Sequence, residues 1–316
     1  MVALEPIAFA VDASEAGDRL DRVLAARFSE TSRSTFARWL EEGRVTVDGV
    51  VAKAKQRTTV GQRIVVRPAP PPATEAIPQD LPLDVVYEDE HLLVVDKAPG
   101  MVVHPAPGHP DGTLVNAVLH HFGALPGEDA ARPGIVHRLD AGTSGVMVIA
   151  RTPVARDELV RRFAAHDIER AYLAIAQGDV PATVTFDTLH GRHPKDRKRF
   201  SGKVDKGKRA VTHVERVRVL HASVLVRCTL ETGRTHQIRV HLAEANCSIL
   251  GDPLYGSPRK DPRLREAAAA LGRQALHAAV LGFVHPVTGE ALRFEREPPE
   301  DFRRALEMLE RPSESV

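Results

Sequence analysis

A run of prolines between residues 68 and 82 constrains this chain most, because neither a helix nor a central strand can pass through it. Each proline lacks the backbone N–H that helices and sheets use, and fixes φ. Such a stretch favours an extended, semi-rigid linker. The sequence therefore predicts domains over 17–67 and 83–305, joined by a linker over 68–82. The length of 316 residues agrees with two domains.

The segment before the prolines predicts a small α/β domain. Apolar residues at helical spacing indicate a helix over 20–28 and a second over 36–40, which follows the capping candidates Thr31-Ser32. Alternating valines at 45–47 then lead into Asp48-Gly49, a dipeptide typical of a tight hairpin turn. A further strand is expected over 64–66, so two helices should pack on a small sheet.

The segment after the prolines predicts many strands and few helices. Because no βαβ alternation is present, we expect an α+β fold on a mainly antiparallel mixed sheet. The expected strands are 83–87, 91–96, 135–139, 146–150, 170–176, 211–219 and 224–230, and the expected helices are 114–122, one after Thr152-Pro153 and one from near Thr235.

Charge is segregated along a chain whose formal net charge is only +1. Residues 17–67 hold 11 Lys and Arg against 6 Asp and Glu, and residues 192–209 hold 9 against 2. Residues 295–316 hold 7 acids against 4 bases. Segregation of this kind is expected where one face meets phosphate, although the basic runs are equally compatible with solvated loops.

The two cysteines, Cys228 and Cys247, are far apart in the sequence. They exclude a disulfide framework and a cysteine-rich zinc site. The N-terminus carries several acids and lacks both a basic start and a long apolar run, so neither a signal peptide nor a membrane span is expected. We therefore expect a cytoplasmic protein with no membrane partner.

The densest polar cluster is Gly134–Gly145, which lies between two apolar runs. It places His137, Arg138 and Asp140 within four positions, and its glycines permit a sharp turn. A carboxylate and a guanidinium held at a strand end could face a cleft. On the residues alone, a surface salt bridge in a turn is slightly favoured, because Asp near Arg is common.

A second polar segment, Glu231–His241, predicts a turn that enters a helix. Ile238 falls on the buried stripe, whereas His236 and Arg239 share the opposite face. Arg239 is therefore expected to be presented at the helix surface rather than packed. His236 and His241 point to different faces and no HExxH or CxxC pattern accompanies them, so no metal site is expected.

Tyr172 lies in the expected strand within Glu169–Ile175 and is one of three tyrosines in the chain. A tyrosine on a strand is usually part of the core. Its ring could equally stack on an extruded nucleobase. The sequence alone leaves both interpretations open.

Several common catalytic motifs are missing from the sequence. There is no GxxxxGK[ST], no GxGxxG and no GxSxG. These patterns supply the phosphate-binding or nucleophile geometry of nucleotide hydrolysis, dinucleotide redox chemistry and serine hydrolysis. The sequence therefore argues against these three activities.

Taken together, the polar segments closely resemble the RluA-type pseudouridine synthases, and among these the RluD type, which modifies large-subunit ribosomal RNA. The N-terminal domain resembles the small RNA-binding domain shared with ribosomal protein S-four. The resemblance covers about residues 17–305. It is carried by His137-Arg138-Leu139-Asp140, Thr143-Ser144-Gly145, Arg170-Ala-Tyr172, Gly233–His241, Gly251–Gly256, Val95–Pro105 and Gln274–Ala278.

The resemblance implies a role for five residues. Asp140 would be the catalytic carboxylate, Arg239 its ion-pair partner and Tyr172 the ring that stacks on uracil. Arg138 would help to extrude the base, and Leu276 would form the apolar floor of the pocket. Ala141-Gly142 departs from the family pattern, which often has a charged residue and an aspartate there; this puts loop rigidity or RNA affinity in doubt, not the chemistry.

The same resemblance implies structured RNA as the partner of a monomeric enzyme. The isomerisation is redox-neutral, so no cofactor and no metal are expected. We predict RNA contacts from Arg138, His137, Arg33, Arg38, Arg44, Lys53, Arg234 and His236.

Three other interpretations compete with this one. A glycosidase would need a second carboxyl group beside Asp140, and the motifs contain none. A non-catalytic ribosome assembly factor could use the same RNA-binding domain, but would not need Asp140, Tyr172 and Arg239 together. Transfer RNA competes with ribosomal RNA as substrate; the additional N-terminal domain favours a large structured RNA.

Overall fold

A computed structural model of the chain forms two compact units, residues 1–73 and 74–316. The described residues are 6–28, 33–53, 55–68, 76–106, 108–127, 132–196, 198–256 and 260–310, without the side chains of residues 33, 34, 37 and 38. Thr31-Ser32 and most of the first half of the proline-rich stretch lie outside these residues. No described helix is long and apolar enough to cross a membrane.

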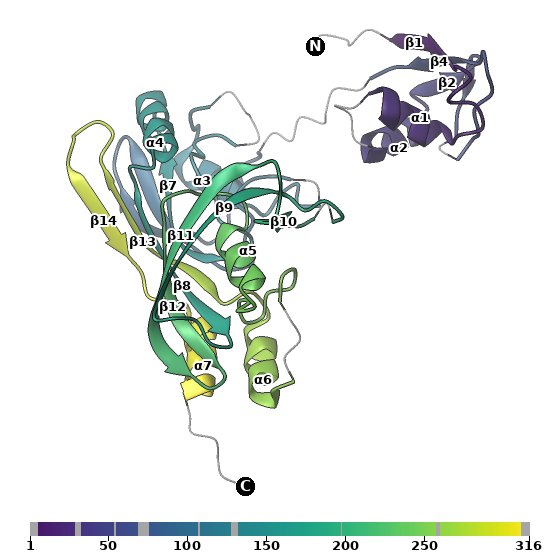
Figure 1. The fold of residues 1–316 in the computed structure, drawn as a ribbon. Coiled ribbons are helices and arrows are strands. Elements are labelled where there is room, and N and C mark those ends of the chain that lie inside the picture. The colour runs from purple at the N-terminus through teal and green to yellow at the C-terminus, as the bar shows by residue number, and fades with distance from the viewer. Residues whose placement is uncertain are drawn as a thin grey trace. The chain divides into compact units, whose positions relative to one another are not determined.

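The first unit packs two helices on a four-stranded antiparallel sheet (Figure 1). Positive φ at Asp48 and Gly49, 48° and 85°, forms the predicted hairpin turn. No strand was predicted at residues 7–10, which lie before the expected domain start at residue 17 and pair with residues 63–66. The elements are β1 (Ile7–Ala10), α1 (Leu20–Arg27), α2 (Arg33–Glu41), β2 (Val45–Val47), β3 (Val50–Val51) and β4 (Arg63–Val66), with sheet order β1-β4-β2-β3.

The second unit is built on a ten-stranded sheet in the order β10-β9-β11-β12-β8-β13-β7-β6-β5, with β14 paired to β13. Every pairing is antiparallel except β13 with β7, which confirms the predicted α+β class with a mainly antiparallel sheet. The strands are β5 (Asp84–Glu88), β6 (Leu92–Lys97), β7 (Ser144–Ala150), β8 (Glu169–Gln177), β9 (Thr183–Arg192), β10 (Phe200–Ser201), β11 (Lys208–Leu220), β12 (Ser223–Leu230), β13 (Leu276–Val284) and β14 (Ala291–Glu295).

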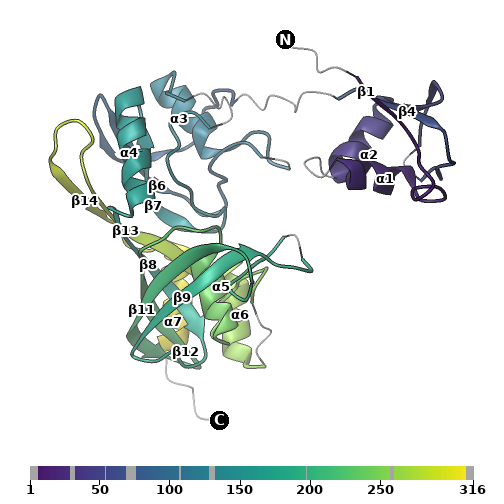
Figure 2. The ribbon, with the colours of Figure 1, turned by 45° about the horizontal axis from the view of Figure 1, so that its top comes forward.

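Helices cover both faces of this sheet (Figures 1 and 2). Alternate residues of β6 and β7 enter two separate hydrophobic clusters, which is why both strands read as continuous apolar runs. Ala155 and Leu159 of α4 belong to one cluster, while α3, α5, α6 and α7 contribute to the other. The helices are α3 (Leu114–Phe122), α4 (Pro153–Ala165), α5 (Gln237–Glu244), α6 (Pro262–Leu271) and α7 (Glu300–Glu310).

Local capping explains where the two best-predicted helices begin. The Thr113 hydroxyl accepts from the backbone N–H of Asn116, and the Asn116 side chain accepts from the Thr113 backbone, which forms a capping box. The Thr152 hydroxyl caps α4 by accepting from the backbone N–H of Ala155, and Pro153 lies in the first turn. The second half of the proline-rich stretch packs on α3, because Asn116 Nδ2 donates to the Ile77 carbonyl at 2.7 Å.

The strand predicted over residues 135–139 is wrong. Only an isolated bridge joins Ile135 to Ile149. Two positions further on, the backbone N–H of Val148 donates to Nε2 of the His137 ring at 3.1 Å instead of to a backbone carbonyl. A side chain thus replaces the ladder hydrogen bond, and the segment continues as a loop toward Asp140.

Candidate active site

Asp140 lies in the loop that leads into β7, with its side chain 17% exposed. The backbone N–H groups of Thr143 and Gly100 bond to the carbonyls of Asp140 and Ala141, at 2.9 and 2.8 Å. Lys97, at the end of β6, donates to the Ala141 carbonyl at 3.1 Å as well as to the Ala98 and Met101 carbonyls. The Asp140 backbone is therefore fixed from two sides before any substrate arrives.

Arg239 of α5 lies between two carboxylates. Its Nη1 is 2.8 Å from Oδ2 of Asp140, and its Nε and Nη2 donate to both oxygens of Asp252 at 2.7 and 2.9 Å. The side chain is only 6% exposed and that of Asp252 is fully buried. The expectation that Arg239 is presented rather than packed is therefore wrong. Gln237 through Leu242 are all buried, because neighbouring elements enclose α5 on almost every side.

The charges in this cluster stabilise one another. Burial opposes ionisation of Asp252, but the hydrogen bond and charge of Arg239 outweigh it and lower the pKa of Asp252 below its usual value. Burial likewise acts to lower the pKa of Arg239, and the two carboxylates more than reverse this. A permanently charged guanidinium thus faces Asp140 Oδ2.

An inner cavity of about 60 Å³ opens onto Asp140. Tyr172 lies on β8 between Cys228 of β12 and Ala278 of β13, and only 9% of it is exposed. Burial raises the pKa of its hydroxyl, so the ring is neutral at ordinary pH. The cavity is lined by Arg138, Leu139, Asp140, Thr143, Tyr172, Leu230, Arg234, His236, Gln237, Ile238, Arg239 and Leu276.

A wider cavity of about 400 Å³ forms the mouth of this site. It shares with the inner cavity the side chains of Arg138, Asp140, Tyr172, Leu230, Arg234 and His236. Arg138 is exposed there. The mouth therefore combines a carboxylate, an aromatic ring and several cationic groups.

His137 also lines the mouth, but its ring has a structural position. It stacks on Phe163 of α4 with centroids 4.5 Å apart, and Nε2 accepts from Val148. Burial, followed by the nearby charge of Arg170, lowers the pKa of His137 to about 3. The ring is therefore neutral, and its Nε2 is already occupied.

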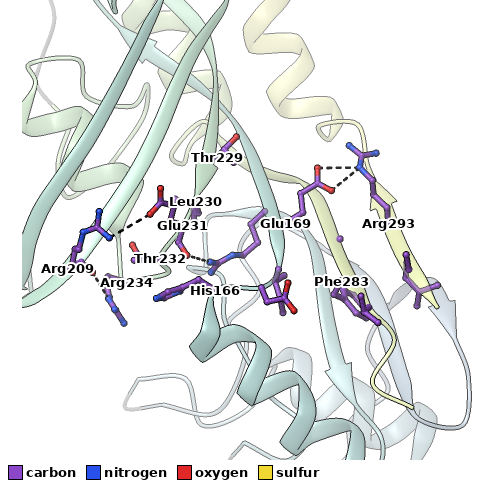
Figure 3. Close-up of a pocket in the computed structure, with 17 residues that line it drawn as sticks. His166, Glu169, Arg209, Thr229, Leu230, Glu231, Thr232, Arg234, Phe283 and Arg293 are labelled. Atoms are coloured by element: carbon purple, nitrogen blue, oxygen red, sulfur yellow. Dashed lines mark hydrogen bonds and ion pairs between the residues drawn. The ribbon is translucent and has the colours of Figure 1, made fainter. Parts of the chain in front are cut away.

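A groove of about 840 Å³ continues from the mouth, sharing His166, Arg170, Leu230 and Arg234 with it. It runs between the end of α4, the adjoining ends of β8 and β12, and the β13–β14 hairpin. Figure 3 shows its ion pairs, Arg293 with Glu169 at 3.1 Å and Arg209 with Glu231 at 3.9 Å.

Four of the predicted RNA-binding residues lie in the first unit. Arg44 is half exposed and pairs with Glu42 at 2.6 Å, and Lys53 is exposed. Arg33 and Arg38 are in α2, but their side chains lie outside the described residues.

Sequence reasoning assigned no role to three residues that build the site: Lys97, Asp252 and Tyr255. Their signal was present, since all three fall in segments that carried the family resemblance. Within the described residues, no group of three or more His, Cys, Asp or Glu could hold a metal. Asp252, although near Asp140, is fully buried and bound by both oxygens to Arg239, which does not suit a glycosidase acid or base.

Comparison with known proteins shows which family the chain belongs to. A family model described as RNA pseudouridylate synthase matches residues 91–244, and an S4 domain model matches residues 18–64. The "Ribosomal large subunit pseudouridine synthase D" of Xanthomonas campestris pv. campestris is 44% identical over 308 residues, covering 95% of this chain and 91% of the relative. This chain is an RNA pseudouridine synthase. It is therefore an isomerase, and its S4 domain is an RNA-binding module.

Other relatives of the synthase agree. The protein of the same name from Pseudomonas aeruginosa is 42% identical, covering 95% of this chain and 94% of that one. The "Uncharacterized RNA pseudouridine synthase YlyB" of Bacillus subtilis is 41% identical over 92% of this chain and 94% of its own length. The solved structure of human RNA Pseudouridylate Synthase Domain Containing 4 matches with a TM-score of 0.54 and 26% identity, covering 73% of this chain and 95% of that one.

Proposed function

We propose that the synthase isomerises specific uridines of large-subunit (23S) ribosomal RNA, with Asp140 as the catalytic carboxylate. The 2.8 Å pair between Asp140 and Arg239, in a cavity shared with Tyr172 and Leu276, carries the proposal. Relatives that match nearly the whole chain are named for the large ribosomal subunit. Ribosomes assemble in the cytoplasm, which is where we expect the protein to act.

Each residue of the cavity has a role in this chemistry. Uracil must leave its ribose, rotate and rejoin through ring carbon 5, so the reaction requires no oxidant or reductant. Arg239 pairs with Asp140 and directs its Oδ2, while Tyr172 stacks on the uracil. Leu276, Leu230 and Ile238 supply apolar walls that retain the detached base.

The uridine has to leave its stack to reach this cavity. Flipping a base costs a few kcal/mol, which stacking and phosphate contacts can offset. Arg138 is exposed at the mouth, where its guanidinium can take the place of the extruded base, and Arg234 and His236 line the same mouth.

Mapping pseudouridine in cells tests the activity and the role of Asp140. Carbodiimide-dependent reverse-transcription stops would be compared in cells with and without the gene, complemented by wild type, Asp140→Asn or the control Asp187→Asn. Asp187 is an exposed carboxylate of β9 that pairs with Arg209 and has no role in our proposal. We expect large-subunit stops to return with wild type and the control only.

The other outcomes of that experiment separate the competing functions. If stops disappear from transfer RNA instead, the ribosomal substrate is wrong and the chemistry stands. If no RNA loses a stop, the protein acts as a binding factor and the role of Asp140 is wrong.

We propose further that Arg33, Arg38, Arg44 and Lys53 of the S4 domain contact RNA phosphates. Arg44→Gln with Lys53→Gln should weaken binding of a 23S fragment and lower the slope of log affinity against log salt by about 2 if each contacts one phosphate. Val50→Thr, an exposed apolar position in the same domain, is the control. An unchanged slope would exclude these contacts.

A further inference from the structure

Tyr255, in the segment Gly251–Gly256, connects to the active site through His236. Its hydroxyl oxygen lies 2.8 Å from the backbone nitrogen of Phe200 and 2.9 Å from Nδ1 of His236. The ring is 5% exposed, and the His236 side chain is 18% exposed. The phenol therefore joins a backbone N–H on one side to an imidazole on the other.

This connection sets which nitrogen of His236 carries a proton. A backbone N–H can only donate, so the Tyr255 oxygen accepts from Phe200 and directs its single hydrogen at Nδ1. Burial lowers the pKa of His236, against the opposing charge of Asp140, so the ring is neutral at pH 7. A neutral imidazole that accepts at Nδ1 carries its proton at Nε2.

The Nε2–H group faces the catalytic carboxylate. Nε2 lies 3.7 Å from Oδ1 of Asp140, which is too far for a good hydrogen bond. The other oxygen, Oδ2, is taken by Arg239. Among the described residues neither Nε2 of His236 nor Oδ1 of Asp140 has another hydrogen-bond partner, so a donor and an acceptor lie side by side in the inner cavity.

The backbone of His236 is also unusual. Its φ of 60° places it in the left-handed region, directly before the first residue of α5. Non-glycine residues rarely adopt this conformation, and they persist in it where the surroundings hold them. The turn directs the ring back over Asp140 instead of along the helix, where the sequence had placed it beside Arg239.

We propose that His236 is a catalytic residue that donates an Nε2–H hydrogen bond to a uracil carbonyl oxygen, and that Tyr255 is the residue that positions it. The proposal rests on the function proposed above. When the C1′–N1 bond breaks, its electron pair stays on uracil, spread over N1 and the adjacent carbonyl oxygen. Oδ1 of Asp140 meanwhile bonds to C1′ or takes the C2′ proton. His236 keeps its own proton and stabilises the oxygen, as an oxyanion-hole donor does.

Two substitutions at one position separate this role from a structural one. Asn tolerates the left-handed backbone but is too short to reach the position of Nε2, whereas the amide of Gln can place an N–H there. We expect His236→Asn to lower the single-turnover rate on an unmodified 23S fragment by about 10²-fold or more, with RNA affinity nearly unchanged. His236→Gln should recover at least about tenfold of that loss.

Tyr255→Phe provides a milder, independent test. It keeps His236 but removes the group that fixes its tautomer, so we expect a rate lower by about three- to tenfold. His213→Asn, an exposed histidine paired with Glu231, is the control and should leave the rate unchanged. Equal rates for wild type and His236→Asn, or a loss confined to RNA affinity, would overturn the proposal.

The tautomer can be measured without any RNA. In protein labelled with ¹⁵N-histidine, the His236 signals are those that disappear in His236→Asn. They should show a protonated Nε2 and an unprotonated Nδ1. Tyr255→Phe should give a mixture of tautomers. A protonated Nδ1 in the wild type overturns the proposal. A wild-type protein that makes no pseudouridine in ribosomal RNA would instead contradict the proposed function, and the two failures remain distinguishable.

Discussion

The catalytic unit contains the same ion-pair chemistry in two very different settings. In the candidate active site, Arg239 and Asp252 are 6% and 0% exposed, and Asp140 completes the cluster. In the groove of Figure 3, Arg293 and Glu169 are 48% and 45% exposed at a similar distance. Exposed pairs contribute at most about 1 kcal/mol to stability, whereas removing one partner of a buried pair costs about 3–5 kcal/mol.

The buried cluster is therefore better explained by function than by stability, because it holds the Asp140 carboxylate in one position. Taking three charges out of water is costly, and a set of apolar residues could fill the same space more cheaply. Apolar residues could not hold the Asp140 carboxylate with one oxygen bound to Arg239 and the other directed into the cavity. The groove pairs can exchange with water and with RNA phosphates, since nothing encloses them.

Replacement of Arg239 by Met should have the largest effect. It leaves Asp252 buried without a counter-ion and Asp140 without its partner. We expect a loss of about 3–5 kcal/mol in the free energy of unfolding, measured by denaturant at pH 7, and loss of pseudouridine formation. A loss below about 1 kcal/mol would mean that the cluster behaves like the exposed pairs.

Asp252→Asn should have a smaller effect that depends on pH. Arg239 keeps Asp140 as a counter-ion, so we expect a loss of about 2–3 kcal/mol at neutral pH. Because the folded pKa of Asp252 is lowered, its contribution is present above the unfolded pKa of about 4 and disappears as the pH falls through the folded value. Wild type and variant should therefore converge in stability in acid; parallel curves would contradict this.

Lys97→Met tests the support beneath the Asp140 loop. The ammonium is 1% exposed and donates to three backbone carbonyls, which methionine cannot do. Burial, with the nearby charge of Arg273, lowers the pKa of Lys97 to about 7. The fold therefore disfavours the charged form, and the contribution of Lys97 to stability is larger at higher pH. We expect a loss of about 1–2 kcal/mol in stability at pH 8, where the amine still donates to these carbonyls.

The rate gives a second measure of the same variant. Displacement of the loop should lower the single-turnover rate by about tenfold. Lys208→Met, at an exposed position of β11, is the matched control. An unchanged rate for Lys97→Met would show that Asp140 is held by its other contacts.

The groove should give the smallest effects. Glu169→Gln and Arg293→Gln each break an exposed pair, and we expect changes within about 0.5 kcal/mol in unfolding free energy. Since the groove adjoins the mouth of the site, RNA affinity measured alongside should rise with Glu169→Gln and fall with Arg293→Gln. A stability loss above about 2 kcal/mol in either variant would mean that the exposed pair contributes as much to stability as a pair in the buried cluster.

Local sequence predicted much of the fold. Helix α3 and the start of α4 follow from capping and periodicity, and the Asp48-Gly49 turn follows from the need for positive φ. The strand over 135–139 failed because a His137 side chain takes the place of a backbone partner, which no periodicity reveals. Motif resemblance brought Asp140, Tyr172 and Arg239 together as a set, and they line one cavity.

The sequence alone was enough for the fold class, the starts of α3 and α4 and the identity of the residues that could carry chemistry, whereas helices α6 and α7 were not predicted. The tertiary structure decided which of their atoms are free: Arg239 is enclosed between Asp140 and Asp252, and His236 is directed by Tyr255. Helical spacing predicts which face a residue occupies, but not what covers that face. Burial, and with it protonation and orientation, depends on segments far away in the chain that close over the helix.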